Sequence, residues 1–107
     1  MAFNPPGSPR DSASRLIPLA EQTRRDNLAT FPAFASLDAV PTFGLSIGIA
    51  SIARLSRAAA MIVWGAGKRE AFRRITAATA YDPAWPATII VECRDAELHA
   101  DRQAAGG

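Results

Sequence analysis

An unbroken run of apolar residues from Ala58 to Trp64 constrains the fold of this chain more than any other feature. The run ends at Gly65. A run of this length bounded by glycine fits a strand buried on both faces. Such strands lie in parallel sheets that are covered by helices on both sides. The run therefore predicts an α/β fold with a strand over 58–64.

The residues after this run place a glycine turn at the start of a helix. The segment Gly65-Ala66-Gly67-Lys68 would bring free backbone N–H groups and one ammonium group to the amino end of a helix expected over 68–80. Unpaired amides and the helix dipole favour an anion there, so the segment predicts a phosphate site. It is not a P-loop, since Arg69 replaces the Ser or Thr that would meet magnesium. A turn that binds nothing remains the alternative.

Lysine usage favours the phosphate interpretation. Lys68 is the only lysine in the chain, beside eleven arginines. An ammonium is a compact point charge, whereas a guanidinium is a wide planar fork. A lone lysine at a helix start therefore indicates a site that needs a compact cation, with chance as the alternative.

The remaining pattern predicts short elements around this unit. Residues 5–14, rich in Pro, Ser and Gly, form a loop. Large and small residues alternate over 43–48, which predicts a strand whose bare face admits another backbone or a ligand, unless its glycines mark a bulge. We expect this strand to be parallel to 58–64 through a right-handed crossover. The other expected elements are a strand at 15–19, a helix at 20–28, short elements at 49–55 and 89–93, and a strand at 97–100.

Composition limits the partners. A chain of 107 residues forms one small domain at most. The formal net charge is only +2 and the basic residues are scattered, so no nucleic acid is expected. Arg54 and Arg57 interrupt the longest apolar stretch and the opening residues do not read as a secretory signal, so no membrane is expected. The only cysteine, Cys93, can form no internal disulfide, so a reducing cytoplasm is the default location.

Few side chains could act in catalysis. His99, the only histidine, has no partner pattern and is interpreted as a surface or structural residue. Cys93, the only cysteine, is interpreted as a buried, inert thiol. Neither a metal site nor a Ser-His-Asp or Cys-His arrangement can be assembled from these residues.

Five short motifs are spread along the chain. They are Ala2-Phe3-Asn4 with Pro6-Gly7-Ser8; Ser14-Arg15 with Glu21-Gln22-Thr23-Arg24; Leu37-Asp38-Ala39-Val40-Pro41-Thr42 before Leu45-Ser46-Ile47-Gly48; Gly65-Ala66-Gly67-Lys68; and Trp85-Pro86-Ala87-Thr88. In this order and spacing they resemble the carboxy-terminal half of the glucosamine-6-phosphate deaminase/isomerase family, over about residues 2–105.

The resemblance implies a Rossmann-like three-layer α/β sandwich, incomplete here, with a few mostly parallel strands and flanking helices. That family converts glucosamine 6-phosphate to fructose 6-phosphate with release of ammonia, and needs no metal or organic cofactor. The implied site residues are Lys68, Gly65 and Gly67 for the substrate phosphate; Phe3, Asn4 and Gly7 as the remnant of an active-site loop; and Arg15 for an allosteric effector.

The chain also departs from the family pattern. The catalytic Asp and His of the family would fall before Met1, so no catalytic residue is assigned and the chain is expected to be inactive alone. Pro5 stands where the family loop has Glu, and Cys93 where it has a motif His. Ala29 and Ile17 replace a phosphate-binding arginine and the lysine that accompanies Arg15 in effector binding.

The whole chain, 1–107, is therefore interpreted as one partial sugar-phosphate isomerase/deaminase domain, with a loop at 1–14, an α/β part at 15–105 and a tail at 106–107. The alternative function is a non-catalytic remnant or an α/β interaction subunit. A 6-phosphogluconolactonase-like protein is disfavoured, because its loop continues differently from Ala2-Phe3-Asn4. Half a sandwich leaves apolar surface uncovered, which predicts self-association or a complementary chain.

Overall fold

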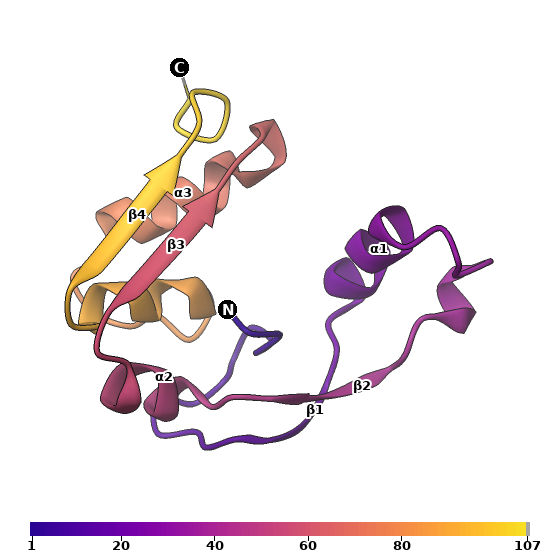
Figure 1. Cartoon of the computed structure of the whole chain (residues 1–107), viewed down its shortest axis with the longest axis horizontal. Coiled ribbons are helices and arrows are strands. Elements are labelled where there is room, and N and C mark those ends of the chain that lie inside the picture. Colours follow the sequence, from indigo (N-terminus) through magenta and orange to yellow (C-terminus); the bar gives the residue numbers. More distant parts are fainter. Residues whose placement is uncertain (107) are drawn as a thin grey trace.

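The computed structural model describes residues 1–106 and consists of two regions that spread apart from a shared N-terminal loop, residues 1–14 (Figure 1). The first region, the arm, spans 15–46 and contains β1 (Arg15–Pro18), α1 (Glu21–Thr30), the 3-10 turn η1 (Leu37–Ala39) and β2 (Phe43–Ser46). The second region, the body, spans 49–106 and contains α2 (Ile49–Leu55), β3 (Ala59–Val63), η2 (Ala66–Lys68), α3 (Arg69–Ala77), η3 (Pro86–Glu92) and β4 (Ala96–Ala100).

The two regions do not close into a sphere. The radius of gyration is 14.3 Å, whereas a compact chain of this length would have roughly 13 Å. No helix within residues 1–106 combines the length and the apolar character that crossing a membrane requires. Gly107, half of the predicted tail, lies outside the described residues.

The body is built on a parallel pair of strands. β3 and β4 pair from Ala59 opposite Ala96 to Val63 opposite Ala100, and α3 and η3 lie between them in the chain. Val63, Ile75 and Ile90 form one buried cluster, so both helical elements pack on the same face of this sheet. The predicted strands at 58–64 and 97–100 and the helix at 68–80 are confirmed with small shifts of their ends.

A second buried cluster attaches α2 to η3. Ile49 and Ala53 of α2 pack on Ile89 of η3, and Ile49 and Ile89 are fully buried. Apolar side chains spaced four residues apart lie on one face of a helix, so Ile49 and Ala53 can both contact Ile89. A helix this short is marginal by itself, and this packing stabilises it.

The arm has little core of its own. β1 and β2 form an antiparallel pair, with Leu16 opposite Leu45, and α1 contains no buried residue. Ile17 and Val40 are the buried apolar side chains here. An exposed ion pair between Arg25 and Glu21, at 2.7 Å, adds little stability to α1.

The expected parallel crossover between 43–48 and 58–64 is wrong. β2 pairs with β1, and β3 pairs with β4 in a different sheet. The reason is that α2 docks on η3 instead of packing back over β2, so the chain does not return beside β2. The α/β class is confirmed as an incomplete sandwich, in which one strand pair is parallel and the other antiparallel.

The small-residue face predicted for 43–48 admits another backbone at Gly48, that of the N-terminal loop. A Cβ atom built on Gly48 would lie 2.1 Å from the carbonyl oxygen of Ser12, far inside contact distance. The backbone N–H of Ile49 donates to Ser12 Oγ at 3.0 Å, and that of Ala50 donates to the Ser12 carbonyl at 3.0 Å. Gly48 therefore lets the N-terminal loop approach closely enough to cap α2.

Candidate functional site

The predicted glycine turn connects β3 to α3. Gly65 has a φ of +87°, a conformation that favours glycine, and it turns the chain into the 3-10 turn that ends at Lys68. The amide of Lys68 donates to the Gly65 carbonyl at 3.1 Å and closes this turn. Lys68 is exposed and directly precedes α3, as the sequence predicts.

The amides of this turn are only partly free. The Gly65 N–H, expected to be free, donates to both carboxylate oxygens of Asp101 at 3.1 Å. The amide of Ala104 also donates to Asp101, at 2.8 Å. Within residues 1–106, the amides of Ala66 and Gly67 have no acceptor. The turn thus presents two amides and one ammonium group, beside a carboxylate that holds the third amide.

A hollow of about 340 Å³ adjoins Lys68. It is lined by the β3 residues with Trp64, by Ala71 and Ile75 of α3, and by Met1 and Ala87. Burial lowers the pKa of the Met1 amino group, and the nearby charge of Lys68 lowers it further. No lining residue carries a carboxylate or an imidazole, so the charge at this hollow is positive and favours an anion.

Asn4 of the predicted loop remnant connects the N-terminal loop to the arm. Its side chain is buried, and Nδ2 donates to the carbonyls of Ile47 at 2.8 Å and Met1 at 3.0 Å. Its Oδ1 accepts from Arg15 Nη1 at 2.9 Å. Ser46 Oγ donates to the Ala2 carbonyl in the same region. Asn4 is therefore satisfied by the protein itself.

Arg15, the expected effector residue, is likewise engaged. Besides Asn4, its guanidinium donates to the Ala13 carbonyl at 3.1 Å and to Ser8 Oγ at 3.4 Å. An anionic effector at Arg15 would have to displace these contacts.

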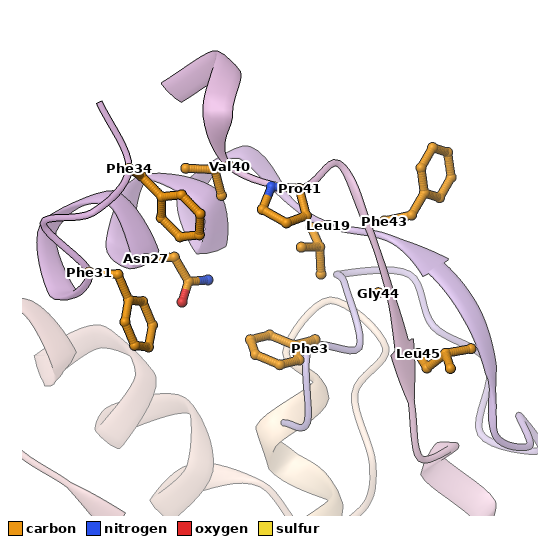
Figure 2. A pocket seen from close by; sticks show the side chains of 10 residues that line it. All are labelled: Phe3, Leu19, Asn27, Phe31, Phe34, Val40, Pro41, Phe43, Gly44 and Leu45. Carbon is orange, nitrogen blue, oxygen red and sulfur yellow. The ribbon is translucent and has the colours of Figure 1, made fainter. Parts of the chain in front are cut away.

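Gly7 and Phe3 lie apart from Lys68. Gly7, with φ of +91°, donates its amide to the Pro83 carbonyl at 2.7 Å and ties the loop to the body. Tyr81 Oη donates to the Ser8 carbonyl at 2.7 Å and strengthens this tie. Phe3 points instead into a separate hollow on the arm (Figure 2). The structure therefore brings the start of the loop to Lys68 through Met1, but not Phe3 or Gly7.

The arm hollow is almost entirely apolar. Its volume is about 290 Å³, and Figure 2 shows Phe3, Phe31 and Phe34 around it. The rings of Phe31 and Phe34 meet edge to face at 6.2 Å. Asn27 supplies the only polar side chain of its lining, and its Nδ2 already donates to the Thr23 carbonyl. This hollow offers apolar contact and no acid–base group.

Carboxylate and imidazole side chains are lacking at the Lys68 hollow. His99 is exposed on β4 and pairs with Glu97 at 3.0 Å, as a surface residue. Cys93 is half-buried rather than buried, and burial raises the pKa of its thiol, with Glu92 adding to the effect. Within residues 1–106, no three His, Cys, Asp or Glu side chains gather closely enough to hold a metal. The arrangement can bind an anion, but it holds no positioned acid–base pair.

Known proteins that resemble this chain are glucosamine-6-phosphate deaminases. That of Beutenbergia cavernae is 41% identical over 90 residues, which cover 84% of this chain and 33% of that protein. That of Shouchella clausii is 31% identical over 105 residues, which cover 98% of this chain and 40% of that protein. No protein-family model matches.

A solved structure resembles the chain over nearly its whole length. It is a monomeric glucosamine-6-phosphate deaminase of the NagB superfamily, 33% identical, with a TM-score of 0.86. The superposition covers 97% of this chain and 41% of that one. The chain thus spans about one third to two fifths of the length of the relatives it matches.

Proposed function

We propose, because this chain belongs to the glucosamine-6-phosphate deaminase family, that it is a deaminase-like protein of amino-sugar metabolism whose Lys68 turn binds the phosphate of an amino-sugar phosphate. The observation that carries this proposal is that Lys68 lies at the start of α3 beside the amides of Ala66 and Gly67, which have no acceptor among the described residues 1–106. These groups are the ones that phosphate takes at helix starts.

The expected binding is weak. One ammonium and two amides supply charge-assisted hydrogen bonds of about 1.5–3 kcal/mol each, and the loss of ligand freedom cancels much of that. We therefore expect a Kd in roughly the millimolar range for the sugar phosphate. The apolar wall of the hollow, made by β3 and α3, would contact the sugar.

Turnover needs more than this site. Sugar ring opening, proton transfer at C2 and release of ammonia require acid–base groups at fixed positions, each worth about 10²- to 10⁴-fold in rate. No carboxylate or imidazole lines the Lys68 hollow. We propose that the 107-residue chain binds the substrate class but does not isomerise or deaminate it without groups from a further segment.

Calorimetric titration with inorganic phosphate and with glucosamine 6-phosphate tests the site. We expect Lys68→Ala to weaken both ligands about tenfold, which corresponds to ~1.4 kcal/mol. Arg57→Ala removes an exposed positive charge from the linker before β3 and serves as the matched control, with unchanged affinity. Binding that is the same in Lys68→Ala and in the unmodified chain would refute the site.

A coupled ammonia assay tests the lack of turnover. The purified chain with glucosamine 6-phosphate should release no more ammonia than Lys68→Ala or buffer. Release above both would show that acid–base groups act within these 107 residues.

The N-terminal loop supports treating 1–107 as a single partial domain. It reaches the arm through Asn4 and Arg15, and the body through the bonds from Gly7 to Pro83 and from Tyr81 to Ser8. A single half-buried thiol, Cys93, fits a reducing compartment, and we propose a cytoplasmic location. Effector binding at Arg15 remains a prediction.

A second candidate function is an α/β interaction subunit that self-associates or binds a complementary chain. Exposed large apolar side chains favour it: Trp64 and Leu45 are 73% and 82% exposed. This function is compatible with phosphate binding at Lys68.

A further inference from the structure

Residues 101–105, which follow β4, form a turn that folds back beside the end of β3 (Figure 1). This C-terminal turn begins where the strand pairing stops: the amide of Asp101 donates to the Val63 carbonyl at 3.3 Å. Ala104 of the turn is 1% exposed and packs in the buried cluster that contains Val63 and Ile75. The C-terminal turn is therefore attached to the body by both its strand pair and its core.

Hydrogen bonds connect the C-terminal turn to both ends of the glycine turn that carries Lys68. At the first end, the Gly65 N–H donates to both carboxylate oxygens of Asp101 at 3.1 Å. At the other end, Arg69 Nε donates to the Gln103 carbonyl at 2.8 Å. The residues between these two attachments, 66–68, are the ones that carry the free amides and the ammonium group. The C-terminal turn thus holds the proposed phosphate site at both of its ends.

The Asp101 side chain also shapes the C-terminal turn itself. Its Oδ1 accepts from the amide of Ala104 at 2.8 Å, and its backbone carbonyl accepts from the amide of Ala105 at 3.0 Å. A side-chain oxygen that accepts a backbone N–H three residues further on caps a helical turn. Because the same Oδ1 also accepts from Gly65, one side chain orients both turns.

Gly65 is the part of the site whose backbone most needs such a contact. Its φ of +87° is open to glycine, which adopts positive and negative φ about equally well. A Cβ atom built on Gly65 or on Gly67 meets nothing within 4 Å, so no close packing holds the backbone there. Without the Asp101 carboxylate, the Gly65 N–H would bond to water and its peptide would be free to rotate. That rotation would redirect the amides that follow.

We propose that Asp101 is a positioning residue for the phosphate site: its carboxylate fixes the peptide of Gly65, and with it the orientation of the two phosphate-binding amides that follow. The proposal rests on the phosphate-binding function proposed above and adds a residue that lies outside the glycine turn. Donors that are already oriented bind a ligand more tightly, because less conformational freedom is lost on binding.

The carboxylate has two effects of opposite sign on an anion. Its hydrogen bonds orient the glycine turn, whereas its negative charge repels phosphate. Asp101→Asn removes the charge and keeps a carbonyl oxygen in the place of Oδ1, which accepts from both Gly65 and Ala104. Asp101→Ala removes the charge and both side-chain acceptors. The comparison of these two variants therefore isolates the hydrogen bonds.

Calorimetric titration of the full chain with inorganic phosphate makes this comparison. We expect Asp101→Ala to bind phosphate about tenfold more weakly than Asp101→Asn, which corresponds to ~1.4 kcal/mol. Without phosphate, the Gly65 amide should exchange with deuterium faster in Asp101→Ala than in Asp101→Asn. Asp38→Ala, which removes an exposed carboxylate from η1 of the arm, is the control and should leave the affinity unchanged.

Urea unfolding checks that the variants stay folded at the concentrations titrated. If Asp101→Ala does not fold, Asp101→Ser replaces it, because serine keeps an oxygen that caps a turn but holds it one bond nearer its own backbone. It should likewise bind phosphate more weakly than Asp101→Asn.

Equal phosphate affinity in Asp101→Asn and the folded Ala or Ser variant would overturn the positioning role, as would an equal loss of affinity in Asp38→Ala. Lys68→Ala separates this inference from the function on which it rests. If Lys68→Ala weakens phosphate binding while the Asp101 variants are alike, only the positioning role is refuted. If Lys68→Ala binds phosphate like the unmodified chain, the site and its positioning residue are refuted together.

Discussion

The body and the arm achieve order by different means. The body buries apolar side chains from several elements against one another, among them Ile49, Val63, Ile75 and Ile89. The arm buries Ile17 and Val40 but leaves α1 without a buried residue. It also depends on hydrogen bonds, from Arg24 to the carbonyls of Leu37 and Val40 within the arm and between the N-terminal loop and Arg15 and Ser46. This difference indicates that most of the free energy of folding comes from the body, whereas the position of the arm depends on a few polar contacts.

The same division separates two kinds of binding surface. The body carries the positive Lys68 hollow at the end of a parallel strand, where ligands commonly bind in open α/β sheets. The arm carries the hollow lined by phenylalanines, which has no charged lining residue. An anion should therefore recognise the body and leave the arm unaffected.

The largest expected effect is on the body core. Ile89→Ala removes a fully buried side chain that joins η3 to α2, and should lower the free energy of unfolding by about 2–5 kcal/mol. Val40→Ala removes a buried side chain of the arm, and should instead raise hydrogen exchange locally around η1 and β2. Urea unfolding and hydrogen exchange measure the two. Equal losses of global stability would contradict the division between the regions.

The next effect concerns the junction between the regions. Gly48→Ala would place a Cβ atom 2.1 Å from the Ser12 carbonyl and 2.3 Å from the Ala13 carbonyl carbon, so the N-terminal loop must move away from α2. We expect a loss of about 1–3 kcal/mol in thermal or urea unfolding. Gly67→Ala is the control, because a Cβ there meets nothing within 4 Å. A Gly48→Ala chain as stable as the control would show that this close approach does not hold the loop.

A smaller effect is expected on affinity. Asp101 holds the Gly65 amide and places a negative charge beside the proposed phosphate site. Asp101→Asn should tighten phosphate binding by about three- to tenfold, since about 1 kcal/mol of repulsion at short range is removed. Asp38→Asn, in η1 of the arm, should leave the affinity unchanged. Weaker binding in Asp101→Asn would indicate that Asp101 organises the turn for the anion.

The smallest effect is a pH dependence of the tie between the loop and the body. The amide of Tyr81 and the guanidinium of Arg10 both donate to Glu92 and hold its pKa below the usual 4.5. A lowered carboxyl pKa stabilises the fold above the unfolded-state pKa, and this contribution disappears as the pH falls from about 4.5 through the folded-state pKa. Glu92→Gln should remove up to about 1 kcal/mol of this acid sensitivity in urea midpoints measured between neutral and acid pH. An identical acid profile in Glu92→Gln would exclude this contribution.

The sequence predicts the elements of the body well, and the reasons are local. The apolar run predicts β3, the spacing of Phe72 and Ile75 predicts the buried side of α3, and Gly65, which has a positive φ, predicts the turn between them. These features need only neighbours in the chain, so a pattern can reveal them.

Contacts between distant segments could not be predicted in the same way. The pairing of β2 with β1 depends on where α2 docks, which is decided by Ile89, forty residues after Ile49 in the chain. Asp101 closes on Gly65 from beyond β4, and only its turn-forming residue type hinted at such a role. The resemblance of Arg15 to an effector residue gave no sign that Asn4 and Ser8 engage it.

The most direct test of the account follows backbone amide resonances during a titration of the chain with glucosamine 6-phosphate, beside a titration with glucosamine. We predict saturable shifts at Ala66, Gly67 and Lys68 with the phosphorylated sugar, no shifts there with glucosamine, and none at Phe31 or Phe34 in the arm with either. Saturable shifts confined to the arm hollow, or equal shifts at Gly67 with both sugars, would contradict the assignment of the phosphate site to the body.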